Sequence, residues 1–387
     1  MNSQSLKYCR HCVMPETKPD LPFDEEGVCG ACRNFEGRKM IDWDERKKEL
    51  VELLNKYRSR DHHTYDCIVP ASGGKDSVFQ TLTMLELGFN PLCVTATTDQ
   101  LSDIGRRNIE NLKRLGVDYI EYTLNPCVRS RINRLALRQV GDISWPEHVS
   151  IFTIPVRIAV QFNVPLIIWG ENSQNEYGGP AAQAEDNVLT RRWLEEFGGM
   201  LGLRVSDLVG QEGITQRDII GYTYPSDEEL KRVGVTGLFL GHYIPWDGFT
   251  NALYAQAHGM ETHPFAIEGS SVNYENLDNI QVGIHDYFKY LKFGFGRATD
   301  LVCMHIRRKR LTREQGLTIV RKLDGKFPWT YLGVPIQRVL EHMDITLEEF
   351  INICDHFTNK KIFLCDSQGK LMKDKQGNLT KINDDNA

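Results

Sequence analysis

Short apolar runs and longer amphipathic stretches alternate through the first half of the chain. Apolar runs predict strands at residues 67–71, 91–97, 119–124 and 165–169. Stretches with apolar residues three and four positions apart lie between them and predict helices at 78–87, 108–115 and 150–162. Strands that are almost continuously apolar are buried on both faces, and strands that alternate with helices pair in parallel. The pattern therefore predicts an α/β fold whose core is a parallel sheet with helices on both sides.

The remaining segments follow other patterns. Residues 42–58 predict a helix that starts with a capping box of Asp42 and Glu45. Residues 178–246 are rich in glycine and contain a short apolar strand at 238–240, and we expect an insertion that covers the substrate. Three short helices are predicted near the end at 312–321, 335–342 and 346–356, the first and last capped by Thr312 and Thr346. Residues 361–382 contain two turn-like segments that suit a terminal hairpin.

One turn carries the strongest chemical signal. It joins the strand at 67–71 to the helix at 78–87 and has the sequence SGGKDS. Adjacent glycines let backbone N–H groups approach an anion, and the following helix adds the partial positive charge of its N-terminus. The spacing differs from that of the Walker loop and of the dinucleotide-binding loop. We therefore expect a phosphate-binding loop formed by Ser72, Gly73, Gly74, Lys75, Asp76 and Ser77.

The charged residues of this loop suit a nucleotide bound with Mg²⁺. Lys75 offers positive charge to phosphate oxygens, and the Asp76 carboxylate is able to hold Mg²⁺ against them. Ligands of parallel sheets bind beyond the carboxyl ends of the strands. Thr97 and Gly170 lie at two further strand ends, and we expect both to contact the nucleotide. The polar residues that follow are typical of a recognition loop and equally of a solvated loop; the candidates there are Glu171, Asn172, Glu176 and Tyr177.

Four cysteines lie within the first 32 residues. Cys9, Cys12, Cys29 and Cys32 form two C-x2-C pairs separated by sixteen residues, which is a zinc-ribbon spacing. One tetrahedral Zn²⁺ would use all four thiolates and leave no open position, so we predict a structural metal. An iron–sulfur cluster uses the same ligands and is the alternative. The other six cysteines are scattered, and most are expected to be reduced and structural.

Composition limits the classes of function. The chain has 387 residues, 41% of them hydrophobic, and a net charge of −6, which is typical of a soluble enzyme of more than one domain. An acidic chain disfavours nucleic acid as a partner, and the lack of a long apolar run or an apolar leader predicts a cytoplasmic protein that does not enter a membrane. We predict a zinc ribbon at 1–40, a linker helix at 41–61, a nucleotide-binding core with the insertion at 62–305, and a C-terminal helical region with the hairpin at 306–387.

Residues 285–300 mix aromatic and charged side chains in the sequence HDYFKYLKFGFGRATD. Aromatic faces cover sugar rings, and cations hold phosphates or negative charge on a leaving group. The alternative is an amphipathic helix with an aromatic core stripe and lysines at its edges. The candidate substrate contacts are His285, Lys289, Lys292 and Asp300, and Arg297 is a candidate catalytic residue. The basic run at 307–313 is typical of solvated surface, with phosphate or partner binding as the alternative.

Together these motifs resemble those of the N-acetyl sugar amidotransferases of bacterial surface-polysaccharide and flagellin-glycan biosynthesis, a family of PP-loop ATP pyrophosphatases. The resemblance extends over the whole chain. The cysteine pairs and the SGGKDS loop are shared more widely, whereas the motifs at 169–179 and 291–300 are specific. The resemblance implies that ATP drives the conversion of an acetamido group into an acetamidino group on a sugar, as in O-antigen or pseudaminic-type glycans. It further implies a separate glutaminase that supplies ammonia.

The chemistry implied by this resemblance agrees with the loop. An amide carbon is a poor electrophile and its oxygen a poor leaving group, so ammonia does not displace the oxygen unaided. Attack of the amide oxygen on the α-phosphate of ATP gives an O-adenylyl imidate and releases pyrophosphate, and ammonia then displaces AMP. Lys75 and Asp76 with Mg²⁺ would neutralise charge on the phosphates. Glu171 or Glu176 is the candidate base for the incoming ammonium.

The cysteines do not provide a glutaminase of their own. A glutaminase needs a catalytic cysteine directly after the initiator Met or in a G-x-C-x-G elbow. Position two is Asn2, and none of the ten cysteines lies in such an elbow. We therefore expect a partner glutaminase, and turnover with free ammonium salts when the chain is alone.

Two alternative functions remain. A tRNA sulfur transferase shares the zinc ribbon and the pyrophosphate loop, although the acidic charge, the lack of a C-x2-C beside the loop and the 292–300 stretch weigh against it. A nucleotide-binding scaffold for a glutaminase is the other alternative. Release of AMP and pyrophosphate that depends on an acetamido sugar would exclude the scaffold, and sulfur transfer to tRNA would support the first alternative.

Overall fold

The computed structural model describes residues 6–59, 63–171, 188–189 and 200–382. Its centre is a six-stranded sheet with the order β3-β2-β1-β4-β6-β5. The five strands from β3 to β6 pair in parallel, and β5 pairs antiparallel to β6 at the edge. The predicted α/β fold is confirmed. The strands are β1 (Cys67–Pro70), β2 (Pro91–Ala96), β3 (Asp118–Tyr122), β4 (Leu166–Trp169), β5 (Val188–Leu189) and β6 (Thr236–Phe239).

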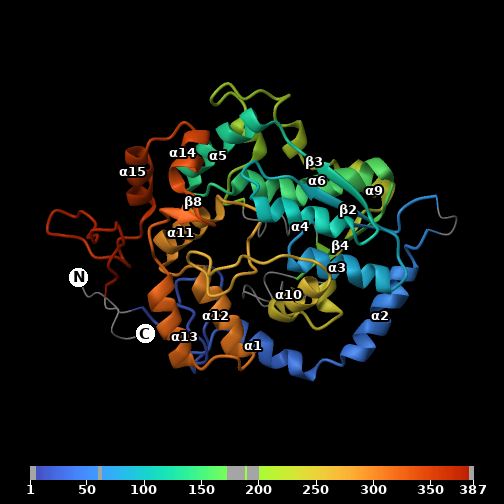
Figure 1. Cartoon of the computed structure of the whole chain (residues 1–387), viewed down its shortest axis with the longest axis horizontal. Coiled ribbons are helices and arrows are strands. Elements are labelled where there is room, and N and C mark those ends of the chain that lie inside the picture. The colour runs from blue at the N-terminus through green and yellow to red at the C-terminus, as the bar shows by residue number, and fades with distance from the viewer. Residues whose placement is uncertain (1–5, 60–62, 172–187, 190–199, 383–387) are drawn as a thin grey trace.

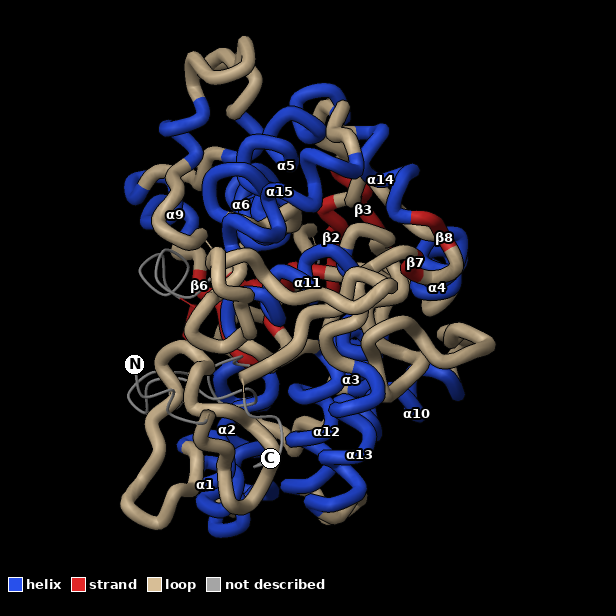
Figure 2. Tube along the Cα trace, turned by 90° about the vertical axis from the view of Figure 1, so that its left-hand side faces the viewer, coloured by secondary structure: helices blue, strands red, loops and turns tan. Residues whose placement is uncertain are grey.

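Helices cover both faces of the sheet, as Figures 1 and 2 show. Neighbouring residues of a strand point to opposite faces, so each strand supplies two cores. Ile68 of β1 packs with α5 (Pro126–Val140) and α6 (Trp145–Phe162), whereas Cys67 and Val69 pack toward the other face. The helices on that second face are α2 (Trp43–Asn55), α3 (Lys75–Glu86), α4 (Asp103–Lys113) and α10 (Gly248–Ala257).

Three core helices begin before their predicted starts. Helix α3 begins at Lys75 rather than at residue 78, α4 at Asp103 rather than at 108, and α6 at Trp145 rather than at 150. Their first turns contain the charged residues Asp76, Asp103 and Glu147, which interrupt the apolar period that a sequence reveals. Helix α5 is missing from the prediction altogether because four arginines interrupt its apolar stripe.

The chain after the core forms further helices around it. The insertion contains α9 (Asp227–Val233), and α10 follows β6; neither was predicted. Thr312 and Thr346 cap the helices that follow them, and Asp42 caps α2, as predicted. The two predicted turns at the end are held by isolated bridges at Cys365–Leu371 and Lys373–Leu379. The other elements are α1 (Gly30–Gly37), α11 (Val282–Phe293), α12 (Arg297–Arg307), α13 (Arg313–Leu323), β7 (Thr330–Tyr331), β8 (Val334–Pro335), α14 (Ile336–His342) and α15 (Leu347–Phe357).

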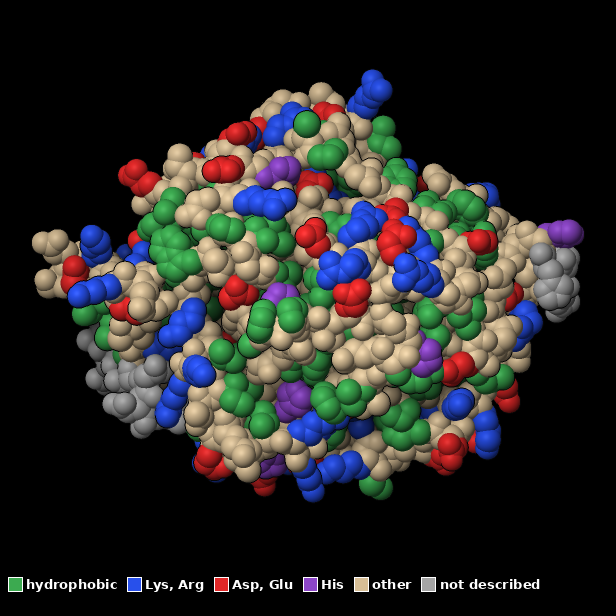
Figure 3. Space-filling model, viewed as in Figure 1, with side chains coloured by type: hydrophobic (Ala, Val, Ile, Leu, Met, Phe, Trp, Pro, Cys, Tyr) green, Lys and Arg blue, Asp and Glu red, His purple; other side chains and the backbone are tan. Residues whose placement is uncertain are grey.

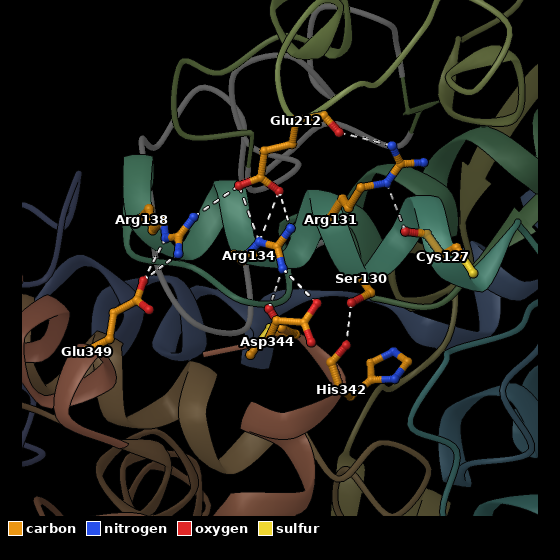
Figure 4. Close-up of polar contacts among 10 residues, drawn as sticks. Cys127, Ser130, Arg131, Arg134, Arg138, Glu212, His342, Asp344 and Glu349 are labelled. Atoms are coloured by element: carbon orange, nitrogen blue, oxygen red, sulfur yellow. Dashed lines mark hydrogen bonds and ion pairs between the residues drawn. The ribbon is translucent and has the colours of Figure 1, made fainter. Parts of the chain in front are cut away.

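Helix α5 connects the insertion to the C-terminal helices, as Figure 4 shows. Arg134 and Arg138 both bind the Glu212 carboxylate of the insertion. Arg138 also binds Glu349 of α15, and Arg134 binds Asp344 in the loop before it. The C-terminal segment therefore packs on the core through α5 and α11, and the division at residues 305 and 306 stays a prediction.

Two features of the structure bear on the charge and hydropathy of the sequence. On the face shown in Figure 3, basic and acidic side chains are interspersed. Among the residues that the structure describes, no helix has the length and apolar character needed to cross a bilayer.

Candidate functional site

The 72–77 loop has the geometry of an anion-binding turn. Gly73 adopts a φ of +80°, which favours glycine. A Cβ atom on Gly73 would also lie 2.7 Å from the backbone of Asn108 in α4. The hydroxyls of Ser72 and Ser77 accept the N–H groups of Gly74 and Gly73 at 3.3 and 3.1 Å. The two glycines thus place their N–H groups at the start of α3, where the partial positive charge of the helix attracts phosphate.

Lys75 and Asp76 lie together at the start of α3. The Lys75 ammonium is buried and pairs with the Asp76 carboxylate and, at 2.9 Å, with Glu275 from the segment before α11. The other oxygen of Asp76 accepts the Asn251 amide at 3.0 Å. Two carboxylates beside a phosphate-binding turn are the oxygen ligands that Mg²⁺ prefers, so Asp76 and Glu275 fit this ion. Glu275 was not predicted from the sequence.

A cavity of about 380 Å³ opens beside this loop. Its walls include the residues that follow β1, β2 and β4, among them Ser72, Thr97 and Gly170. Strand order reverses at β1, because β2 and β3 lie on one side of it and β4 and β6 on the other. This is the switch point at which parallel sheets bind ligands. The cavity lies where the sequence predicts the site.

Buried hydroxyls line the cavity where β2 ends. The Oγ1 atoms of Thr97 and Thr98 have no hydrogen-bond partner among the described residues. A buried polar atom without a partner is costly unless a ligand or water satisfies it. Thr97 therefore suits contact with a nucleotide, as predicted from its place at a strand end.

A segment that is distant in sequence closes the cavity. Residues 276–280 run along residues 100–102, where Ser102 N donates to Asp278 O at 2.9 Å and Ile280 N to Gln100 O at 3.0 Å. A Cβ atom on Gly105 would lie 2.6 Å from the Cα atom of Asp278, so the segment rests directly on α4. The same segment lines the cavity together with Arg297.

A buried arginine holds the strand end that carries Thr97. Arg129 of α5 is 1% exposed and donates to the carbonyl oxygen of Thr97 at 3.1 Å and to Ser150 Oγ at 3.0 Å. The same guanidinium lies 3.4 Å from Oε1 of Glu147. Burial raises the pKa of Glu147 to about 7, against the attraction of Arg129. Arg129 thus fixes the backbone at the end of β2.

Three titratable residues meet at another wall of the cavity. Asp142 accepts from His285 Nδ1 at 2.7 Å and from the Ser144 backbone N–H at 2.9 Å. Its second oxygen lies 3.6 Å from His148 Nδ1. Burial raises the pKa of Asp142, but His285, His148 and the Ser144 N–H outweigh this effect and lower it below its usual range. Both imidazoles line the cavity.

The structure brings together only part of the predicted substrate-binding set. His285 and Arg297 line the cavity, and Arg297 is held by Asp286 at 3.0 Å. Lys289 pairs with Asp300 instead, and neither residue lines the cavity. Lys292 donates to the carbonyl oxygen of Val140 at 2.7 Å, away from the site. These three residues therefore belong to the packing of α11 and α12, which corrects the expected substrate contacts.

The recognition loop after β4 is described only at its start. Gly170 and Glu171 line the cavity as predicted. Asn172, Glu176 and Tyr177 lie outside the described residues, so their roles stay predictions.

Several residues of the site were missed from the sequence. Glu147, His148 and Ser144 lie on or before the first turn of α6, which the apolar pattern did not include. Asn276 and Asp278 lie in a segment without regular structure. The cluster of Asp142, Ser144, Glu147 and His148 ahead of an apolar helix was the available signal, because polar first turns of helices in such sheets face ligands.

The four N-terminal cysteines form a compact ligand set. Their sulfur atoms all lie within 4.8 Å of one another and are buried. The Cys9–Cys32 and Cys12–Cys29 sulfur distances are 3.9 and 3.7 Å. A tetrahedral Zn²⁺ with Zn–S bonds of ~2.3 Å places its sulfurs ~3.8 Å apart. The set therefore fits one tetrahedral ion, in agreement with a structural zinc site.

The two C-x2-C segments pack against α12 and α13. The cysteines share a hydrophobic cluster with Val302, Cys303 and Phe295. Arg313 of the basic run donates to the carbonyl oxygens of Cys9 and Cys12 at 3.3 and 3.1 Å. Part of the basic run is thus used within the fold rather than left as solvated surface.

Comparisons with known proteins add a biosynthetic context. Residues 268–375 match the family model described as the LPS biosynthesis protein WbpG-like, C-terminal domain. This region is about a quarter of the chain and includes the segment that closes the cavity, α11 and Arg297. No curated protein matches the chain. One solved structure that aligns is NMN synthetase from Francisella tularensis, with 15% identity over 50% of this chain and 92% of that chain and a TM-score of 0.28. The fold assignment rests on the sheet order of the chain itself.

Proposed function

We propose that this protein is an ATP-dependent amidotransferase of glycan biosynthesis, which converts an acetamido group of a sugar precursor into an acetamidino group. The observation that carries the proposal is a single cavity with two kinds of wall. An anion-binding turn and three strand ends form one side, and a segment from the region similar to the WbpG-like C-terminal domain forms the other. ATP and a glycan precursor are the two ligands that such a cavity would bring together.

The residues present support an adenylation mechanism. The N–H groups of Gly73 and Gly74 and the Lys75 ammonium would hold the β- and γ-phosphates, and the two N–H groups would then leave the Ser77 and Ser72 hydroxyls that they bind in this structure. The Thr97 strand end would face the rest of the nucleotide. Mg²⁺ bound by Asp76 and Glu275 would supply positive charge to the phosphates. Lys75 would have to leave its carboxylate partners as phosphate binds, since a buried ammonium pairs with whichever anion is nearest.

The substrate side of the cavity is polar and partly positive. Arg297, which pairs with Asp286, lies there and would offer positive charge to the substrate or to the leaving AMP. The amide oxygen would attack the α-phosphorus, pyrophosphate would leave toward the 72–77 loop, and ammonia would then replace AMP on the imidate carbon. The walls of the cavity would exclude water, which would otherwise hydrolyse the adenylate.

We further propose that a partner glutaminase supplies the ammonia. All ten cysteines lie within the described residues, and Cys127 alone among them is exposed. Cys127 lies in the first turn of α5 and has no G-x-C-x-G elbow around it. The chain by itself should therefore use ammonium and not glutamine.

One assay tests the proposal. The purified chain is incubated with ATP, Mg²⁺, ammonium and a panel of free and nucleotide-linked acetamido sugars, and AMP, ADP and pyrophosphate are measured. We expect one sugar class to trigger release of AMP and pyrophosphate, with a product in which an oxygen is replaced by NH. Asp76→Asn should abolish turnover, whereas Asp44→Asn on the exposed first turn of α2 should not change it.

Other outcomes would refute the proposal. Formation of ADP would exclude adenylation. Transfer of sulfur to tRNA would make the chain an RNA-modifying enzyme, and nucleotide binding without any turnover in the presence of the whole panel would make it a scaffold.

A further inference from the structure

His285 and Asp142 have the arrangement of an oriented base. Asp142 is 5% exposed and, because its pKa is low, ionised, so its oxygens only accept hydrogen bonds. The His285 nitrogen that lies 2.7 Å from it, Nδ1, therefore carries the proton. The neutral ring then has its lone pair on Nε2, for which no described residue provides a hydrogen-bond partner. This is the tautomer that a general base requires.

Glu147 and His148, which line the same cavity, are less suited to take a proton. Both oxygens of Glu147 are engaged, one 3.4 Å from Arg129 and the other accepting the Asn133 amide at 3.1 Å. Burial lowers the pKa of His148 to about 4, so its ring accepts protons poorly at neutral pH. The Nδ1 atom of His148 has no hydrogen-bond partner among the described residues, so its ring is not oriented as that of His285 is.

We propose that His285 is the general base for the attack of ammonia and that Asp142 is its positioning residue. The proposal rests on the proposed amidotransferase function, and it replaces Glu171 and Glu176 as the candidate base. His285 lines the same cavity as Arg297, Thr97 and the 72–77 loop. An imidazole takes up and releases protons near neutral pH, which suits proton transfer from an added amine.

The step balances in atoms and electrons. The imidate nitrogen keeps the amide proton after adenylation, so the reacting bond is C=NH⁺. The lone pair of ammonia forms the new C–N bond, and the π electrons of the C=NH⁺ bond move to its nitrogen. One proton of the added nitrogen passes to Nε2 of His285. The C–O bond then breaks, AMP leaves with its electron pair and the former amide oxygen, and an amidinium ion remains. His285 returns its proton to solvent or to pyrophosphate.

Separate assays of adenylation and of amination distinguish a failure of this proposal from a failure of the proposed function on which it rests. Adenylation is measured as the sugar-dependent exchange of labelled pyrophosphate into ATP in the absence of ammonia. Amination is measured as the formation of the amidine in the presence of ammonium. His285→Gln should keep the exchange and slow amination by about 10²-fold or more. Hydroxylamine, a stronger nucleophile that is neutral at pH 7, should restore much of the lost rate. His356→Gln on the exposed side of α15 is the matched control and should keep both activities.

A second variant tests the role of Asp142 and is also the test if His285→Gln fails to fold. Asp142→Asn removes the charge that stabilises protonated His285, so the acid limb of the amination rate should move to lower pH. The charged or titratable groups around His285 are Asp142, His148, Asp286 and Arg297, and only the first is altered. A merely structural role of Asp142 would lower the rate without moving this limb.

The contrary results are distinct. Equal loss of exchange and amination in His285→Gln would overturn the base assignment and make His285 a substrate contact. Loss of amination alone in Glu171→Gln, with His285→Gln fully active, would return the role to the carboxylate. Absence of sugar-dependent exchange in the unaltered chain would instead refute the proposed function, and the base assignment with it.

Discussion

Substitution of Gly73 by alanine separates two effects that the structure superimposes at this position. The φ of Gly73 is +80°, and an L-residue in this region loses ~1–2 kcal/mol. A Cβ atom would also lie 2.7 Å from both the carbonyl carbon of Asn108 and the backbone nitrogen of Ile109. Its distance from the carbonyl oxygen of Asn108 would be 2.9 Å. Backbone atoms of a helix cannot rotate away, so α3 and α4 would have to separate, and such overpacking costs ~1–3 kcal/mol. We expect a total loss of ~2–5 kcal/mol.

The same helix offers a matched control. Gly88 follows the other end of α3 with a φ of +72°, and a Cβ atom there would meet nothing within 4 Å. Gly88→Ala should therefore show the backbone effect alone, ~1–2 kcal/mol. The difference between the two variants, ~1–3 kcal/mol, is the steric effect of α4 against the loop.

Urea unfolding followed by tryptophan fluorescence measures both free energies of unfolding. Binding of an ATP analogue at equal folded fraction then measures the loop itself: Gly73→Ala should weaken it, because the N–H groups shift with the backbone, and Gly88→Ala should not. Equal destabilisation of the two variants would show that α4 does not press on the loop. Unchanged nucleotide binding by folded Gly73→Ala would contradict the assigned phosphate site.

Two further predictions concern pH and metal. Burial lowers the pKa of His148 to about 4 from an unfolded value of ~6.5, so the unfolded state binds more protons between these two pH values. The free energy of unfolding therefore falls as the pH falls through this window, by up to ~1.4 kcal/mol per pH unit. His148→Gln should show a flatter dependence of the urea midpoint on pH, and identical slopes in the two proteins would contradict the burial of His148. Cys9→Ser should prevent metal binding by the four N-terminal cysteines and should lower the melting temperature of the protein. Cys365→Ser lies outside this ligand set and should keep one ion per chain. Elemental analysis identifies that ion, and iron with acid-labile sulfide in place of zinc would overturn the structural zinc site.

The tertiary structure also decides which side chains of one helix reach the site. His285, Lys289 and Lys292 lie on α11, and the sequence offers all three as substrate contacts. Only His285 turns toward the cavity, because Asp300 holds Lys289 and the Val140 carbonyl holds Lys292. Those partners come from other elements, so the sequence of the helix does not reveal which cations remain for a ligand.

The features that the sequence determined are local ones. Apolar runs give the strands, two glycines between a strand and a helix give the turn before α3, and two C-x2-C pairs give a compact set of four thiols that fits a metal ion. Each depends mainly on residues close together in the sequence. The second wall of the cavity depends on contacts over long stretches of chain. Asp142 meets His285 across 143 positions and Lys75 meets Glu275 only when residues 276–280 lie along residues 100–102. Such pairings are fixed by packing and not by local pattern. They bring His285 and residues 276–279 to the same cavity as the 72–77 loop.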